Sequence, residues 1–173
     1  MADADAMNKE VRSLVDLLRR TIAVYEAWLP LCQAKRRAIA SADAESLNAV
    51  IRQENEKLQA IGELEKQRLN LVASLTQRVD PRAAAPMKMV ELADALAEPE
   101  RSELLMTRIE LRERMHDVHR QSSIARRATE SLARHMTSTV RSVAAVAAGV
   151  TTYSARGEQP ARRFAVRTLN TTA

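Results

Sequence analysis

Glycine, aromatic side chains and cysteine are all scarce in this sequence. The 173 residues include three glycines and 2% aromatic residues, too few for the turns and strands of an all-β fold. Cys32 is the only cysteine, which excludes an intrachain disulfide and a cysteine-cluster zinc site. Hydrophobic residues make up 46% of the chain, a balance that is typical of helical bundles when aromatics are this rare. The composition therefore predicts an all-α fold.

Long apolar runs are missing as well. The longest uncharged stretch, residues 142–155, is shorter than the roughly 20 apolar residues that a membrane-spanning helix needs. The first residues, MADADAMNKE, lack the basic segment and apolar core of a secretory signal. A single cysteine also suits a reducing compartment. We therefore expect a cytoplasmic protein with no membrane insertion.

Positive charge is concentrated toward the C-terminal end. Residues 1–80 carry 12 basic and 12 acidic side chains, and residues 81–120 carry 7 and 8. Residues 121–173 carry 8 and 2, which accounts for the net charge of +5. A basic end suits anionic partners such as nucleic acid or a membrane surface, and it is equally typical of a solvated arginine-rich tail.

The first long periodic segment predicts a helix over about residues 7–40. Its apolar and semi-apolar residues recur every three or four positions, which places them on one face of a helix that packs lengthwise against another. Pro30 lies inside this pattern, where it predicts a kink and not a domain boundary. The residues of the face are Val11, Leu14, Leu18, Thr21, Tyr25, Trp28 and Cys32.

A second helix is predicted over about residues 43–79, joined to the first as an αα-hairpin. Ser41 or Asp43 is suited to cap its N-terminus. Its expected packing face is Leu47, Ile51, Glu54, Leu58, Ile61, Arg68, Val72, Leu75 and Val79, widened by Leu64, Leu69 and Leu71.

Two prolines, Pro81 and Pro86, interrupt the pattern, and we expect a short helix over about 87–96 beyond them. Glu98-Pro99-Glu100 then marks the start of a long helix over 99–149, roughly 75 Å if unbroken. The pattern does not decide whether this helix is broken near residues 121–123. We predict one helical-bundle domain over residues 1–157, and a disordered basic tail over 158–173.

The last part of the long helix carries a face of small and medium apolar residues. They follow steps of four, four, three, four and three, while Arg134 and Arg141 lie on the other side. Such a face either packs back on the bundle or receives an amphipathic helix from another protein. Its residues are Leu132, Met136, Val140, Val143, Ala147 and Val150.

Catalytic and metal-binding patterns are weak. His116 and His119 are three apart with Asp117 between them, but arginines surround them and no third ligand is apparent. Carboxylates two apart, as in Glu54/Glu56, diverge on a helix, so acid/base catalysis has no support. We therefore expect a protein that is not an enzyme and that has no metal or cofactor.

Several residues leave two interpretations open. Tyr25 and Trp28 suit either the packing of the first helix pair or a surface contact. Met87, Met89, Met106 and Met115 suit either core filling or a pliable binding surface. Near the C-terminal end, four arginines beside one aromatic would allow weak phosphate contact, although no nucleic-acid-binding motif accompanies them. These residues are Arg156, Arg162, Arg163, Arg167 and Phe164.

The order of these segments resembles the FlgN family of flagellar export chaperones. The resemblance covers roughly residues 10–157 and includes the proline-interrupted linker. The family fold, an antiparallel helical bundle with a long C-terminal helix, agrees with the periodicity. The matching stretches are RAIASADAESL at 37–47, NAVIRQENEKL at 48–58, EPERSELL at 98–105 and TYSARG at 152–157.

This resemblance implies a function and its sites. Members bind hook-associated proteins of the hook-filament junction, shield the C-terminal helices of these clients from premature assembly, and deliver them to the type III export gate and its ATPase. The small-residue face from Leu132 to Val150 would then dock the client helix, and Tyr153 would contact the export gate. The segment after Gly157 departs from the family pattern. The alternative is a coiled-coil adaptor that self-associates through its helical faces.

Overall fold

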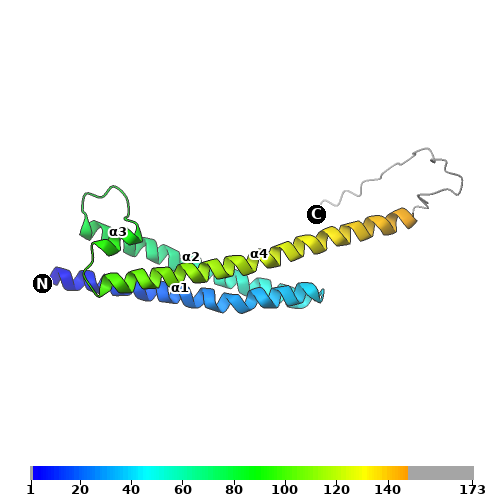
Figure 1. Cartoon of the computed structure of the whole chain (residues 1–173), viewed down its shortest axis with the longest axis horizontal. Helices are drawn as coiled ribbons and strands as arrows, with labels where there is room; N and C mark the ends of the chain where they lie inside the picture. The colour runs from blue at the N-terminus through cyan, green and yellow to red at the C-terminus, as the bar shows by residue number, and fades with distance from the viewer. Residues whose placement is uncertain (1, 148–173) are drawn as a thin grey trace. The chain divides into compact units, whose positions relative to one another are not determined.

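The computed structural model describes residues 2–147 and contains four helices. They are α1 (Ala2–Ala40), α2 (Ala44–Val79), α3 (Met89–Asp94) and α4 (Glu100–Ala147) (Figure 1). Residues 2–147 contain no strand. The all-α prediction and the long C-terminal helix are therefore confirmed, and the predicted disordered tail over 158–173 lies outside the described residues.

The helix limits differ from the prediction mainly at the ends. The first helix begins at Ala2 instead of near residue 7, and it continues through Pro30 without interruption. The short third helix is six residues long and falls inside the predicted range 87–96. The last helix runs without a break across residues 121–123, which the sequence pattern had left open.

A three-residue turn joins α1 and α2 tightly. The Asp43 amide donates to the Ala38 carbonyl at 2.9 Å and the Ala42 amide to the Ile39 carbonyl at 3.2 Å, which is the paired pattern of a Schellman helix end. Ala42 has a φ of 54°, the left-handed conformation that this motif requires and that usually selects glycine. Asp43 then caps α2 by accepting from the Ser46 amide at 3.0 Å, so one of the two predicted caps is confirmed.

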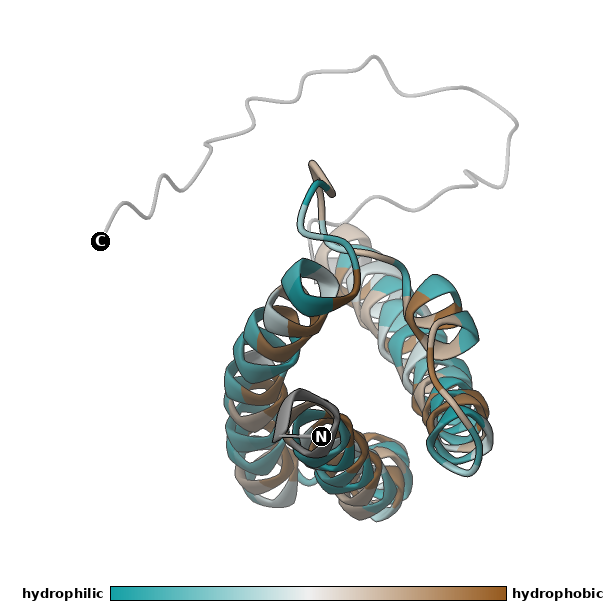
Figure 2. Cartoon of the chain, turned by 90° about the vertical axis from the view of Figure 1, so that its left-hand side faces the viewer, coloured by the Kyte–Doolittle hydropathy of each residue, from teal (hydrophilic) through white to brown (hydrophobic). Residues whose placement is uncertain are grey.

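The contacts divide the chain into two compact units, Met1–Ser131 and Leu132–Ala173. The first unit holds α1, α2, α3 and the first part of α4. Its core lies where α3 meets the N-terminal halves of α1 and α4 and the C-terminal half of α2. Figure 2 views the helices end-on and shows the apolar side of α2 turned toward α1. The buried core residues are Val11, Leu14, Val15, Leu18, Val72, Leu75, Leu92, Ala93, Leu96 and Leu104.

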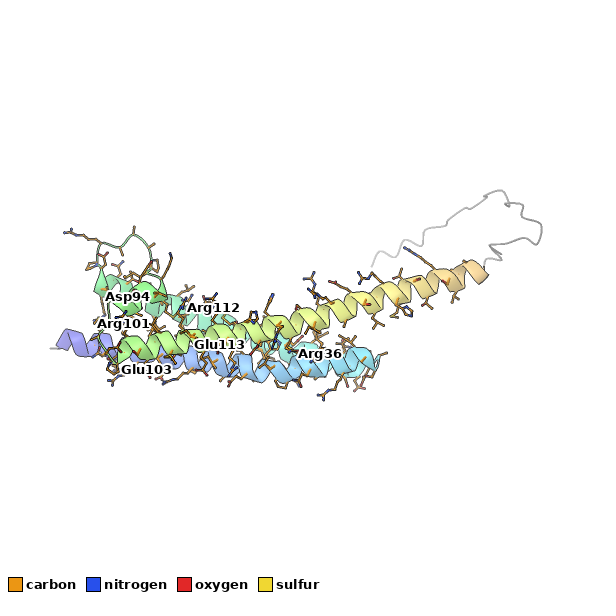
Figure 3. The ribbon with its side chains drawn as sticks, in the orientation of Figure 1. Arg36, Asp94, Arg101, Glu103, Arg112 and Glu113 are labelled. Atoms are coloured by element: carbon orange, nitrogen blue, oxygen red, sulfur yellow. The ribbon has the colours of Figure 1, made fainter. Side chains whose placement is uncertain are left out.

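Polar contacts fix the register between α1 and α4. Residue numbers rise together along the two helices, so α4 runs parallel to α1, and α2 is antiparallel to both. At the start of α4, Arg101 also pairs with Asp94 of α3 at 2.9 Å, and both are labelled in Figure 3. The α1–α4 pairs are Arg12–Glu100 at 3.5 Å, Arg19–Glu103 at 2.7 Å, Glu26–Arg114 at 3.1 Å and Cys32–Ser122 at 3.5 Å.

The predicted packing face of α2 was partly wrong. Ile51, Leu58 and Leu69 are exposed, whereas Val50 and Thr76, which the pattern omitted, are buried. The predicted face is wider than the strip of α2 that packs in the core, because the apolar spacing alone does not reveal how many neighbours a helix has. The result is a helix with an apolar flank that reaches the surface.

Candidate functional site

The predicted client face occupies the described part of the second unit. Leu132, Met136, Val140 and Val143 are 37%, 60%, 65% and 62% exposed, although all four are large and apolar. Spacings of four, four and three residues place them in one row on α4, about 16 Å long. Ala147 is the last residue of α4, and Val150 and Tyr153 lie outside the described residues.

The register of the first unit shows how far α4 pairs with α1. Cys32 faces Ser122, and α1 ends eight residues later, at Ala40. Two parallel helices advance equally, about 1.5 Å per residue, so α1 has a partner residue on α4 only up to about residue 130. The helix nevertheless continues to Ala147. The apolar face thus begins at about the residue of α4 where its pairing with α1 ends.

Hydroxyl side chains in this segment bond to the helix itself. Thr137 Oγ1 donates to the Ala133 carbonyl at 2.9 Å, and Thr139 Oγ1 to the His135 carbonyl at 3.0 Å. Because these hydroxyls already have acceptors, they present little unmet polarity to a partner. Such back-bonding also weakens a helix slightly. A docked helix would therefore find an apolar face on a segment that gains stability from the contact.

The opposite side of the same segment is basic. Arg134 and Arg141 are seven residues apart, so they share a face about 10 Å in length, on the side away from the apolar row. Residues 131–147 contain no aspartate or glutamate. The segment is therefore an amphipathic helix with an apolar and a positively charged side.

A groove in the first unit was not predicted from the sequence. It has a volume of about 410 Å³, and it is walled by α1, α2 and α4 with one residue of α3. The one signal for it in the sequence is methionine content, since Met89 and Met115 suit either core filling or a pliable binding surface. The lining residues are Thr21, Tyr25, Ile61, Glu65, Arg68, Met89, Arg108, Leu111, Arg112 and Met115.

The groove wall contains Tyr25, which stacks on a ring outside the groove, and an ion pair. Tyr25 stacks on Trp28 with ring centroids 6.4 Å apart, and both residues are half-buried. Burial raises the pKa of the Tyr25 phenol, and the negative charge of Glu65 raises it further. Arg68 donates to Glu65 through two nitrogens, which lowers the pKa of the Glu65 carboxyl.

The described residues form neither of two other kinds of site that the sequence raised, a metal site and a membrane span. Within residues 2–147, His116 and His119 belong to no group of three or more side chains suited to holding a metal. No helix in the described part of the chain is long and apolar enough to cross a membrane. The tail arginines and Phe164 lie beyond the described residues.

Comparison with known proteins identifies the family. Residues 7–161 match the family described as FlgN protein, a span that includes most of α1, the whole of α2, α3 and α4, and the whole apolar face. No curated protein and no solved structure matches the chain. Because the match extends over most of the sequence, the chain belongs to the FlgN family, and its general role is that of a flagellar export chaperone.

Proposed function

We propose that this protein binds the C-terminal helices of hook-associated proteins in the cytoplasm and delivers these clients to the export gate. The observation that carries the proposal is the row of exposed apolar side chains at the end of α4 in a member of a chaperone family. The client helix would dock on Leu132, Met136, Val140, Val143, Ala147 and Val150.

The size of the face suits a reversible complex. Leu132, Met136, Val140 and Val143 are only partly exposed, so their burial would contribute roughly 1 kcal/mol each. A client helix would add a comparable contribution from its own apolar face. Ordering the two helices and losing translational freedom offset part of this gain. The expected complex is stable enough to prevent client self-association and weak enough to release at the gate.

Export-gate contact is proposed for Tyr153. It follows the apolar face in the sequence TYSARG at residues 152–157, the stretch that resembles the family. A tyrosine is suited to such a contact because it combines a large apolar ring with a hydroxyl that forms hydrogen bonds. Delivery would then use a residue separate from the client face.

Self-association through this face is the alternative to client binding. An exposed apolar row on one side of a helix is also the kind of surface through which coiled-coil adaptors pair. The adaptor alternative predicts a stable dimer without client, whereas the chaperone predicts a 1:1 complex with client, and solution mass separates the two.

Calorimetry tests the proposed face. The C-terminal helical segment of a hook-associated protein from the same organism is titrated into the intact chain and into Met136→Asp/Val140→Asp. Ser138→Asp/Ser142→Asp is the matched control, because it adds the same two charges at the same spacing, away from the apolar row of α4. We expect saturable 1:1 binding to the intact chain and the control, and at least tenfold weaker binding to the double variant. Equal affinity for all three chains would refute the assigned face.

A further inference from the structure

The groove in the first unit has walls that are suited to contact a helix. Its walls come from helices that run alongside one another, with Tyr25 on α1, Ile61 on α2, and Leu111 and Met115 on α4. Met115 is 46% exposed. Helices that lie side by side with apolar residues between them form a groove into which the side chains of another helix can pack. The groove therefore suits a helix better than it suits a compact small molecule.

The charges at the groove are unequal. Arg68 is neutralised by Glu65, whereas Arg108 and Arg112 form no ion pair within the described residues. These two arginines are four residues apart on α4, so their guanidinium groups lie on neighbouring turns of one face; Arg112 is labelled in Figure 3. Arg108 is also half-buried, which makes a missing carboxylate more costly than it would be at an open surface.

We propose that this groove binds an acidic amphipathic helix of a protein partner. Apolar side chains of that helix would contact Tyr25, Leu111 and Met115, and its carboxylates would pair with Arg108 and Arg112. Bidentate arginine–carboxylate pairs fix the position of a partner as well as attracting it. The site is distinct from the apolar face that begins at Leu132, and it does not depend on the function proposed for that face.

The protein contains a natural reporter for this site. Trp28 is the only tryptophan, and its ring stacks on Tyr25, which lines the groove. A helix seated on Tyr25 would change the surroundings of this stacked pair. Trp28 emission should therefore shift on binding.

The probe is a synthetic 18-residue amphipathic peptide with a leucine stripe flanked by glutamates, titrated into the full chain. A second peptide has lysines in place of the glutamates. We expect the acidic peptide to shift Trp28 emission with saturation and the basic peptide to bind at least tenfold more weakly. Equal binding of both peptides, or no binding of the acidic one, overturns the proposal. A response to inorganic phosphate alone, without the acidic peptide, would indicate a simple anion site and also overturns it.

Three variants locate the binding. Arg108→Ser/Arg112→Ser should weaken the acidic peptide at least tenfold, while Arg134→Ser/Arg141→Ser, with the same loss of charge elsewhere on α4, should leave it unchanged. Met115→Gln should weaken it severalfold, which tests the apolar floor without touching charge. Equal losses in both arginine variants would show nonspecific attraction and contradict the proposal.

Met136→Asp/Val140→Asp separates this site from the proposed client face. The acidic peptide should bind this variant as it binds the intact chain. If Met136→Asp/Val140→Asp abolishes peptide binding and Arg108→Ser/Arg112→Ser does not, the groove proposal fails and the client-face proposal is unaffected. If Met136→Asp/Val140→Asp abolishes binding of the client segment and still binds the acidic peptide, both proposals are supported independently.

Discussion

Glu54 on α2 is buried and accepts a hydrogen bond from Lys35 on α1, with 2.6 Å between Lys35 Nζ and Glu54 Oε2. Its other oxygen, Oε1, accepts from Trp28 Nε1 at 3.4 Å. One carboxylate thus joins two residues of α1 that lie two helical turns apart. It holds the two helices of the hairpin in one register, in the half of the hairpin away from the main hydrophobic core.

Removing this carboxylate should destabilise the hairpin. Glu54→Ala leaves Lys35 and the Trp28 N–H without their acceptor, and we expect a loss of about 2 kcal/mol in the free energy of unfolding. Urea denaturation followed by Trp28 emission measures it. Glu56→Ala, an exposed carboxylate two residues away, is the control and should change the free energy by less than about 0.5 kcal/mol. Equal effects of the two substitutions would contradict this role of Glu54.

Glycine should be better than alanine at the turn between α1 and α2. Ala42 has a φ of 54°, where its Cβ is strained against the backbone. Ala42→Gly removes this strain, and after the entropic disadvantage of glycine we expect a gain of about 0.5–1 kcal/mol in the free energy of unfolding. Thermal denaturation of both chains tests it. A lower melting temperature for the glycine variant would show that residue 42 is not left-handed.

The cap of α2 should contribute to acid sensitivity. Hydrogen bonds from the Ser46 side chain and amide lower the pKa of Asp43. Its folded pKa is therefore below its unfolded pKa, so the stabilisation is complete above the unfolded value and is lost as pH falls through the folded one. Asp43→Asn keeps a cap without the charge.

Denaturant unfolding of the two chains between about pH 6 and about pH 2 tests this cap. The original chain should lose stability relative to Asp43→Asn as the acidic end is approached. A stability difference that stays constant across this range would rule out the charged cap.

Thr76 should anchor the linker that follows α2. Its buried hydroxyl donates to the Val72 carbonyl at 2.7 Å and accepts from the Met87 amide at 2.9 Å. Thr76→Val keeps the shape but leaves the Met87 N–H without an acceptor, so we expect a loss of about 1–2 kcal/mol. Thr137→Val, whose hydroxyl bonds only within its own helix, is the control and should cost less than about 0.5 kcal/mol. Hydrogen exchange at Met87 should quicken in the first variant only.

The sequence could predict features that depend on one helix at a time. The period of the apolar residues located α1, α2 and α4, and an acidic residue in SADAE was one of two predicted caps, confirmed at Asp43. Glu54, placed by spacing on the packing face, is indeed buried. Each of these follows from the geometry of a single helix and its ends.

Features that depend on several helices together could not be predicted. Position 42 has a left-handed backbone but is occupied by alanine, which does not indicate such a conformation in a sequence. Leu58 and Leu69 are exposed because the number of helices that pack around α2 is a tertiary property. The groove needs the angular placement of three helices, which no single periodicity contains. The apolar row at Leu132–Val143 was found from its spacing, but its exposure required the structure.

Hydrogen–deuterium exchange of the full chain, with and without the client's C-terminal helical segment, tests the central claim most directly. Amides of residues 132–147 should exchange fast in the free protein, because the apolar face there is exposed. Saturating client should slow their exchange at least tenfold. Formation of the complex with no change in this segment, and with protection elsewhere in the chain, would contradict the assignment of the client face to the end of α4.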